Sequence, residues 1–348
     1  MKSFFVTLSA FCAAILTSVV LLSVFASREM EAASKKALVL NGAGASFPAP
    51  VYQNWTNSYS QKSGVVKINY QSIGSGAGVN QLKENTVDFA GTDNPLTAEQ
   101  QEAAGMEQFP MVTGGVVVIY NLPTLKGTTL KLSRQVLAEM YLGKITKWND
   151  AKIAACNPGV ALPDTPVTVV RRADSSGTSF LFTDYLAKCS PEWKEQVGAG
   201  SSVKWPVGIG GQKNPGVCNN VAKIVGAIGY TEYTYAVEAN LSMAALENKA
   251  GNYVEASPAN FAASSASVDW KNAAGFYVVL TDGEGDQSWP ITGVTYILVR
   301  KDLAPEKRAA LKEYFQWCFT EGAAAAARLN YVPLGQPVYE EIFSKVLK

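Results

Sequence analysis

The chain has 348 residues, of which 47% are hydrophobic and 17% are charged, and this indicates a globular protein with two domains or one large one. Thirty basic residues against 29 acidic residues give a formal net charge of +1, so the overall charge provides no basis for binding nucleic acid or an anionic membrane surface. Histidine is absent from the sequence, which excludes Ser-His-Asp and Cys-His catalysis and removes the commonest ligand of transition metals.

The first 33 residues have the pattern of an export signal. A basic Met1-Lys2 pair precedes an apolar run over residues 3–26, Val-Phe-Ala at 24–26 offers a small-residue cleavage site, and Glu-Ala-Ala at 31–33 is a poorer one. We expect this signal to direct the chain to the periplasm, or another extracytoplasmic space, and to be removed. The alternative is a retained membrane anchor, because the run exceeds the usual apolar core of about 7–15 residues and approaches the ~20 that span a bilayer.

After a polar linker at residues 29–36, strand and helix patterns alternate along the chain. Strands are expected at residues 37–40, 65–70 and 87–90, with helices at 51–60 and 79–83 between them. A continuous apolar strand is expected at 115–120, then a helix at 133–142 that Ser133 caps and Gly143 ends. Further strands are expected at 168–171, 227–230 and 294–299, with helices at 180–186 and over most of 304–348. This series predicts the α/β class, with a parallel sheet covered by helices.

Four cysteines follow the expected signal: Cys156, Cys189, Cys218 and Cys318. An exported chain folds where disulfides can form, but the spacing of these cysteines matches no metal site. Cys218 and Cys318 lie in helical runs, where a thiol is usually a small buried apolar group. A bridge between Cys156 and Cys189, or four free thiols, are the two possibilities left open.

Glycines and hydroxyl residues gather where two strands are expected to give way to helices. The first cluster is Asn-Gly-Ala-Gly-Ala-Ser-Phe-Pro at residues 41–48, and the second is Arg-Arg-Ala-Asp-Ser-Ser-Gly-Thr-Ser-Phe at 171–180. A helix start offers free backbone N–H groups and the positive end of the helix dipole. Arg172 adds a cation with bidentate geometry, and Ser176 and Thr178 add hydroxyl donors. Together these features predict a site for an oxyanion.

Two weaker signals fall at the same kind of position. Ser75 lies in the Gly-Ser-Gly-Ala-Gly run at residues 74–78, and Asp93 follows the strand expected at 87–90; each alone is more often a plain turn or cap. In open α/β sheets, however, ligands bind at the carboxyl ends of the strands. A carboxylate suits an anion site when the anion carries a proton, as phosphate does at neutral pH and sulfate does not.

From about residue 38 to its C-terminus, the chain resembles the PstS family, the periplasmic phosphate-binding subunits of phosphate ABC transporters. The resemblance rests on the residues at 42–50, 71–75, 87–93, 141–148, 171–180, 203–206 and 289–292. It implies that the phosphate-binding residues are Ser46, Phe47, Ser75, Asp93, Arg172, Ser176, Gly177 and Thr178. Asp93 would accept the proton of phosphate, and Asp174 would orient Arg172.

The resemblance also implies a fold and partners. The fold would be the two-lobe periplasmic binding protein fold of type II, with residues 37–112 and 284–348 in one lobe, residues 113–283 in the other, and the ligand in the cleft. The partners would be inorganic phosphate and the permease and ATPase subunits of a membrane transporter. We expect a monomer with no cofactor, no metal, no nucleic acid partner and no catalytic residue.

Other functions stay open from the residues themselves. The same fold could bind another tetrahedral oxyanion such as sulfate or molybdate, and Asp93 is the feature against it. A secreted phosphatase that uses a serine would need a base, and the sequence offers no obvious one. A structural or adhesive surface protein would leave the predicted anion site without a role.

The export signal gives a first prediction. N-terminal sequencing of the exported protein should find a mature chain that starts between Ser27 and Ser34, because both small-residue cleavage sites lie in that region. An exported chain that still begins at Met1 would show that the apolar run is a membrane anchor.

Overall fold

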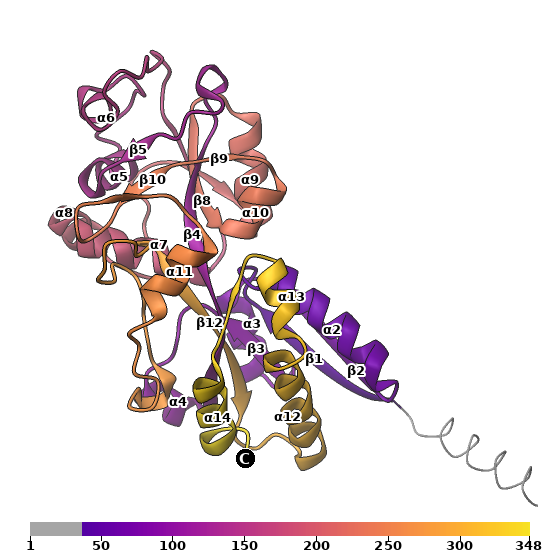
Figure 1. The fold of residues 1–348 in the computed structure, drawn as a ribbon. Coiled ribbons are helices and arrows are strands. Elements are labelled where there is room, and N and C mark those ends of the chain that lie inside the picture. Colours follow the sequence, from indigo (N-terminus) through magenta and orange to yellow (C-terminus); the bar gives the residue numbers. More distant parts are fainter. Residues whose placement is uncertain (1–36) are drawn as a thin grey trace, which may run out of the picture.

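The computed structural model describes residues 37–348, and the expected signal at residues 1–33 lies outside the described residues. The described chain forms two α/β lobes (Figure 1). One lobe combines the indigo N-terminal part with the yellow C-terminal part, and the other contains the middle of the chain. Within residues 37–348, no helix is both long enough and apolar enough to cross a membrane.

A mixed sheet of ten strands runs through both lobes in the order β2-β1-β3-β12-β4-β8-β6-β7, with β13 and β9 also paired to β4. Its strands are β1 (Leu38–Gly44), β2 (Val66–Ser72), β3 (Phe89–Thr92), β4 (Met106–Tyr120), β6 (Thr168–Arg172), β7 (Ile209–Gly211), β8 (Ala227–Glu232), β9 (Ser242–Met243), β12 (Thr292–Arg300) and β13 (Val332–Pro333). A small second sheet contains β5 (Lys131–Leu132), β10 (Ala245–Glu247) and β11 (Tyr253–Val254).

The prediction of a purely parallel sheet is wrong. β1, β2 and β3 are parallel, as are β6, β7 and β8, but β12 runs antiparallel to β3 and β4, and β4 runs antiparallel to β8. β4 is also longer than the expected strand at residues 115–120, because its first half pairs with β12 and its second half with β8. The pairing of β4 with a strand near the C-terminus has no local sequence signal. It makes β4 a continuous connection between the two lobes (Figure 1).

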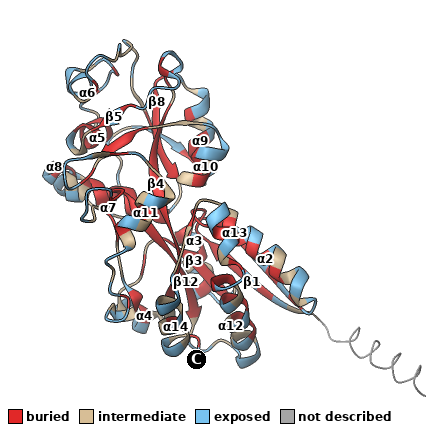
Figure 2. Ribbon diagram, in the orientation of Figure 1, coloured by how far each residue is buried: buried red, intermediate tan, exposed pale blue. Residues whose placement is uncertain are grey.

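The lobe that contains both chain ends is covered by helices from both ends. These are α2 (Ala49–Ser63), α3 (Ser75–Lys83), α4 (Ala98–Ala104), α12 (Pro305–Phe319), α13 (Ala323–Arg328) and α14 (Gln336–Lys345). Tyr59 of α2 packs its ring against Tyr314 and Trp317 of α12, and Trp55 Nε1 donates to the Gly322 carbonyl at 2.8 Å. These contacts, in which Tyr59, Tyr314 and Trp55 are buried and Trp317 is partly buried, join the two ends of the described chain into one core (Figure 2).

The lobe formed by the middle of the chain contains α5 (Arg134–Tyr141), α6 (Ala151–Cys156), α7 (Gly177–Cys189), α8 (Pro191–Gln196), α9 (Lys213–Lys223) and α10 (Tyr233–Glu238), and α11 (Pro258–Ser265) follows them along the chain. Ser133 caps α5 as predicted, since its hydroxyl accepts from the Val136 N–H. In the core, the Phe182 ring stacks on Tyr230 with 4.2 Å between centroids. This stack packs α7, which begins near the predicted anion site, against β8.

All four cysteines of the described chain are free. Cys218 and Cys318 are buried in α9 and α12, as expected. Cys156 and Cys189 lie at the ends of α6 and α7, where the Cys156 Sγ donates to the Lys152 carbonyl and Cys189 lies beside Tyr185. The possible bridge between these two thiols is therefore not formed, because each has different neighbours.

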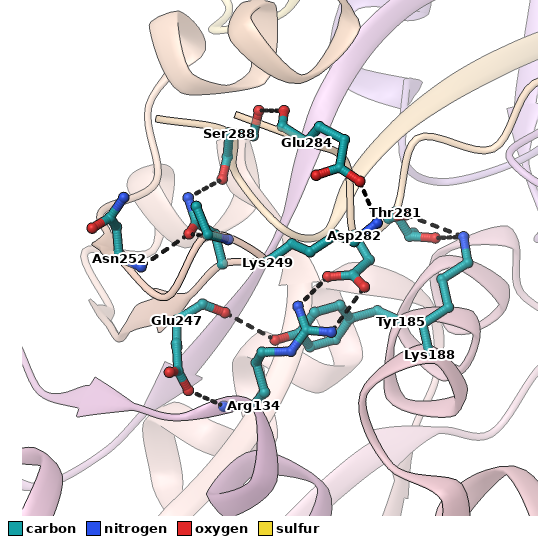
Figure 3. Close-up of polar contacts among 12 residues, drawn as sticks. Arg134, Tyr185, Lys188, Glu247, Lys249, Asn252, Thr281, Asp282, Glu284 and Ser288 are labelled. Atoms are coloured by element: carbon teal, nitrogen blue, oxygen red, sulfur yellow. Dashed lines mark hydrogen bonds and ion pairs between the residues drawn. The ribbon is translucent and has the colours of Figure 1, made fainter. Parts of the chain in front are cut away.

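The segment that leads into β12 is tied to α5 and α7 by polar contacts (Figure 3). Arg134 of α5 forms an ion pair with Asp282, and Lys188 of α7 donates to the Thr281 hydroxyl at 2.8 Å. The Asp282 side chain is only 8% exposed, so water weakens this ion pair less than it would on an open surface. The start of β12 is thus fixed to the lobe that carries α7.

Candidate functional site

The predicted strand–helix junctions come together where the lobes meet. Ser46 and Phe47 precede α2, Ser75 is the first residue of α3, and Ser176 caps α7 by accepting from the Ser179 N–H at 3.1 Å. The Gly177 N–H donates to Ser75 Oγ at 3.0 Å, so the starts of α3 and α7 are in direct contact. Several helix N-termini at one place make a positive environment that favours an anion.

Asp93 lies directly against the start of α7. A Cβ atom on Gly177 would be 2.6 Å from Asp93 Oδ2, which no side chain could tolerate. Gly78 meets a similar constraint, because its Cβ would lie 2.4 Å from the Gly44 Cα. Glycine at these two positions lets the backbone segments of the site approach one another closely.

Arg172 and Asp174 form a two-point ion pair. The Arg172 Nε donates to Asp174 Oδ1 at 2.9 Å and Nη2 to Oδ2 at 2.5 Å, while the Lys213 N–H also donates to Oδ1. Burial alone would raise the pKa of Asp174, but the hydrogen bonds and charge of Arg172 outweigh it and lower the pKa. This pair fixes the guanidinium plane and leaves Nη1 facing away from Asp174.

Four buried polar atoms at this site have no hydrogen-bond partner within residues 37–348. They are both carboxyl oxygens of Asp93, Nη1 of Arg172 and Oγ1 of Thr178, and their residues are at most 2% exposed. An unpaired buried polar group costs about 1–3 kcal/mol, and more when it is charged. The set contains both donors and an acceptor, so it fits a ligand that is an anion and also carries a proton. Within residues 37–348, no three His, Cys, Asp or Glu side chains gather as metal ligands.

Burial raises the pKa of Asp93 from 3.8 to about 7. The Thr295 hydroxyl lies close to the carboxyl, although the two do not have full hydrogen-bond geometry. This hydroxyl and the charge of Arg172 both lower the pKa of Asp93, but they offset the effect of burial only in part. Near neutral pH the carboxyl is therefore partly protonated. It can either donate a hydrogen bond to a ligand or accept one from it.

The turn at residues 45–47 is held from behind by three tyrosines. The hydroxyls of Tyr70, Tyr235 and Tyr331 donate to the carbonyls of Ala45, Ser46 and Phe47, respectively, at 2.9, 2.7 and 2.7 Å. The C=O and N–H of a trans peptide point in opposite directions. The bond from Tyr235 to the Ser46 carbonyl therefore also fixes the direction of the Phe47 N–H.

Sequence reasoning missed several residues of this site. Asn214 is fully buried at the start of α9, and its Nδ2 donates to Ser46 Oγ at 2.9 Å. Ser201 accepts from Asn94 Nδ2 at 2.9 Å and, through its carbonyl, from the Ser176 N–H at 2.9 Å. The Gly-Gly pair at residues 210–211, which ends the short strand β7 just before α9, repeats the strand–helix pattern of the other junctions and could have pointed to Asn214. Ser201 lies in a loop and had no such signal.

Comparison with known proteins identifies the family. Residues 31–321 match the PBP superfamily domain. The chain is 47% identical over 312 residues to the phosphate-binding protein PstS of Pasteurella multocida. The aligned region covers 89% of this chain and 90% of that protein. It is 45% identical over 307 residues to the protein of the same name from Haemophilus influenzae, with 88% and 92% covered. The chain belongs to the PstS family.

Solved structures confirm the predicted two-lobe fold. A high-affinity periplasmic phosphate-binding protein, solved with phosphate, superposes with a TM-score of 0.71 at 20% identity and covers 89% of this chain and 94% of its own. A putative phosphate ABC transporter substrate-binding protein of Clostridium perfringens, also with bound phosphate, gives a TM-score of 0.63 at 19% identity, with 85% and 100% covered. This chain and these two structures share the same α/β architecture.

The raised pKa of Asp93 gives a prediction about stability. In the folded protein Asp93 favours its protonated form, so its stabilising effect is complete below about pH 4 and is lost as the pH rises through about 7. Asp93→Asn cannot ionise. Relative to this variant, the ligand-free parent should lose a few kcal/mol of unfolding free energy between pH 4 and pH 7, since one pKa unit corresponds to about 1.4 kcal/mol.

Urea unfolding in phosphate-free buffer at several pH values measures this difference. The matched control is Asp286→Asn, since Asp286 is exposed, and its unfolding free energy should follow that of the parent. A constant difference between the parent and Asp93→Asn at every pH would contradict the raised pKa.

Proposed function

We propose that this protein binds inorganic phosphate between its lobes and delivers it to an ABC importer. The observation that carries the proposal is the meeting of unpaired buried donors on Arg172 and Thr178 with the unpaired buried carboxyl of Asp93. Membership of the PstS family supports it, since the relatives at 45–47% identity are named phosphate-binding proteins. The proposal assigns no catalytic residue to the chain.

Phosphate has the protonation that this set of groups requires. Its oxygens would accept hydrogen bonds from the backbone and hydroxyl groups of Ser46, Phe47, Ser75, Ser176, Gly177 and Thr178 and from Arg172. Its P–OH group would donate to the ionised Asp93. Sulfate has no proton at neutral pH, so against the same carboxylate it would meet like-charge repulsion and an unmade hydrogen bond.

We also propose how binding is communicated to the transporter. With lobes at residues 37–112 plus 284–348 and at 113–283, Asp93 and Arg172 lie on different lobes, so a ligand held by both favours the closed arrangement. The closed monomer, located in the periplasm by the N-terminal signal, would be the form that the permease and ATPase subunits recognise.

Closure can be tested with Arg172→Ala. Truncating one partner of a buried charged contact costs about 2–5 kcal/mol, so this variant should lose phosphate affinity by more than 30-fold. At a phosphate concentration just above that of the protein, small-angle scattering should show a smaller radius of gyration for the parent and no change for Arg172→Ala. The control is Arg328→Ala, because Arg328 is exposed on α13. An unchanged radius for phosphate-saturated parent would contradict closure.

Asp93 should decide selectivity between phosphate and sulfate. A missing hydrogen bond of this kind can give discrimination of about 10⁴–10⁵, and Asp93→Asn should reduce the ratio of the two dissociation constants strongly, because an amide can turn a donor toward sulfate. Sulfate binding by the parent should also weaken as the pH rises through about 7, since only protonated Asp93 can donate to it.

Calorimetric titration of both proteins with each anion, at fixed salt, measures these constants. A parent that binds sulfate as tightly as phosphate would favour a general oxyanion-binding protein instead. If the ratio of the phosphate and sulfate dissociation constants is the same in Asp93→Asn and in the parent, Asp93 is not the proton acceptor. Release of phenol from an aryl phosphate, measured in parallel, would instead indicate a phosphatase.

A further inference from the structure

Glu232 is a buried carboxyl that takes part in no ion pair within residues 37–348. It ends β8 and caps α10, where its Oε1 accepts from the Thr234 N–H at 3.0 Å. Its Oε2 lies 3.2 Å from the Tyr331 hydroxyl oxygen. Both Glu232 and Tyr331 are at most 1% exposed. This contact connects α10 to the C-terminal part of the chain, directly behind the Ser46–Phe47 turn.

The number of hydrogens and the two distances together indicate which group donates in this contact. The Tyr331 hydroxyl has one hydrogen and two possible acceptors: the Phe47 carbonyl oxygen lies 2.7 Å from the hydroxyl oxygen, and Glu232 Oε2 lies 3.2 Å from it. The shorter distance assigns this hydrogen to the Phe47 carbonyl. The contact between Tyr331 and Glu232 is then a hydrogen bond only when Glu232 carries a proton and donates it to the phenol oxygen.

The surroundings of Glu232 agree with a protonated carboxyl. Burial raises the pKa of Glu232 from 4.5 to about 8, and donation from Thr234, and from Tyr331 to the ionised carboxylate, offsets this rise only in part. The titratable and charged groups around this cluster are Tyr233, Tyr235 and Glu238 of α10, Cys218 of α9, Arg172 of β6 and Tyr331. Burial also raises the pKa values of the tyrosines and of Cys218.

We propose that protonated Glu232 is a positioning residue for the phosphate site, because its proton occupies the Tyr331 oxygen and leaves the Tyr331 hydrogen on the Phe47 carbonyl. Tyr331 then holds the peptide plane after Phe47, and Tyr235 holds the plane before it through the Ser46 carbonyl. With both planes held, the φ and ψ angles of Phe47 are fixed, and so is its N–H. The inference rests on the proposed function, in which this N–H binds phosphate.

Ionisation of Glu232 would reverse the arrangement. The proton leaves to solvent, and the carboxylate then competes with the Phe47 carbonyl for the single Tyr331 hydrogen. A hydrogen bond to a charged acceptor is about twice as strong as one to a neutral acceptor. The Phe47 carbonyl would lose its partner, the turn would be held less firmly, and phosphate affinity would fall as the pH rises through about 8.

The variant Glu232→Gln separates this role from a purely structural one. Its amide oxygen can still accept from the Thr234 N–H, and its NH₂ group can donate permanently to Tyr331, so it imitates the protonated acid. Phosphate itself and Asp93 also titrate in this range, but equally in both proteins. The ratio of the parent's phosphate Kd to that of the variant should be near one at pH 6 and should rise several-fold by pH 9.5.

Calorimetric titration with inorganic phosphate from pH 6 to pH 9.5 measures this ratio, and Glu238→Gln is the matched control because Glu238 is exposed on the same helix. The control should give a ratio of one throughout. Tyr331→Phe removes the hydroxyl that connects Glu232 to Phe47, so this variant should bind phosphate more weakly than the parent at pH 6. Adding Glu232→Gln to Tyr331→Phe should not change the phosphate affinity further at any pH. A flat ratio for Glu232→Gln, or a loss of affinity in that variant at pH 6, would overturn the inference.

A measurement without phosphate tests the protonation itself. In ¹³C spectra of the ligand-free parent labelled at glutamate side-chain carboxyls, the signal absent from Glu232→Gln should titrate with a midpoint of about 8. A midpoint in the ordinary range of glutamate would overturn the inference even if phosphate binds. A parent that binds no phosphate at pH 6 would instead overturn the proposed function, and with it the role of Glu232 in binding.

Discussion

The site depends on the burial of the Asp93 carboxyl against the start of α7. Gly177 is the feature that permits this contact, since any side chain there would occupy the space of Asp93. Because the buried carboxyl is not hydrated, its pKa depends on the burial itself and on the protein groups around it. The same burial leaves the donors on Arg172 and Thr178 without partners among the described residues. In an open site, water would satisfy all these atoms and they would select for no ligand.

This burial requires contributions from both lobes, and the sheet makes such contributions possible. Asp93 follows β3, whereas Arg172 ends β6 and α7 follows it. β3 and β6 lie on opposite sides of β4, the long strand that pairs with β12 over one half and with β8 over the other. The two groups of parallel strands, one on each side of β12 and β4, can therefore direct their carboxyl ends toward one another. A single parallel sheet would place all junctions along one edge, with water on the opposite side.

The parts of the site are fixed by groups that do not themselves face the ligand position. Asp174 holds the guanidinium of Arg172 at two points, and three tyrosine hydroxyls hold consecutive carbonyls of the turn before α2. The ion pair of Arg134 with Asp282 fixes the entry to β12. Each of these contacts restricts a backbone or side-chain angle before any ligand arrives, which lowers the entropy cost of binding.

The sequence by itself determined the local features: the strands, the helices, the caps such as Ser133, and the glycine-rich junctions with their hydroxyl and charged residues. These depend on residues that are close along the chain. Tertiary structure alone decided the antiparallel course of β4 and β12, the absence of a bond between Cys156 and Cys189, and the recruitment of Asn214, Tyr235, Tyr331 and Glu232 to the site. These contacts join residues up to 284 positions apart. Because a hydrogen bond to a backbone carbonyl needs only a donor at the right place, it leaves no pattern in the sequence near either partner.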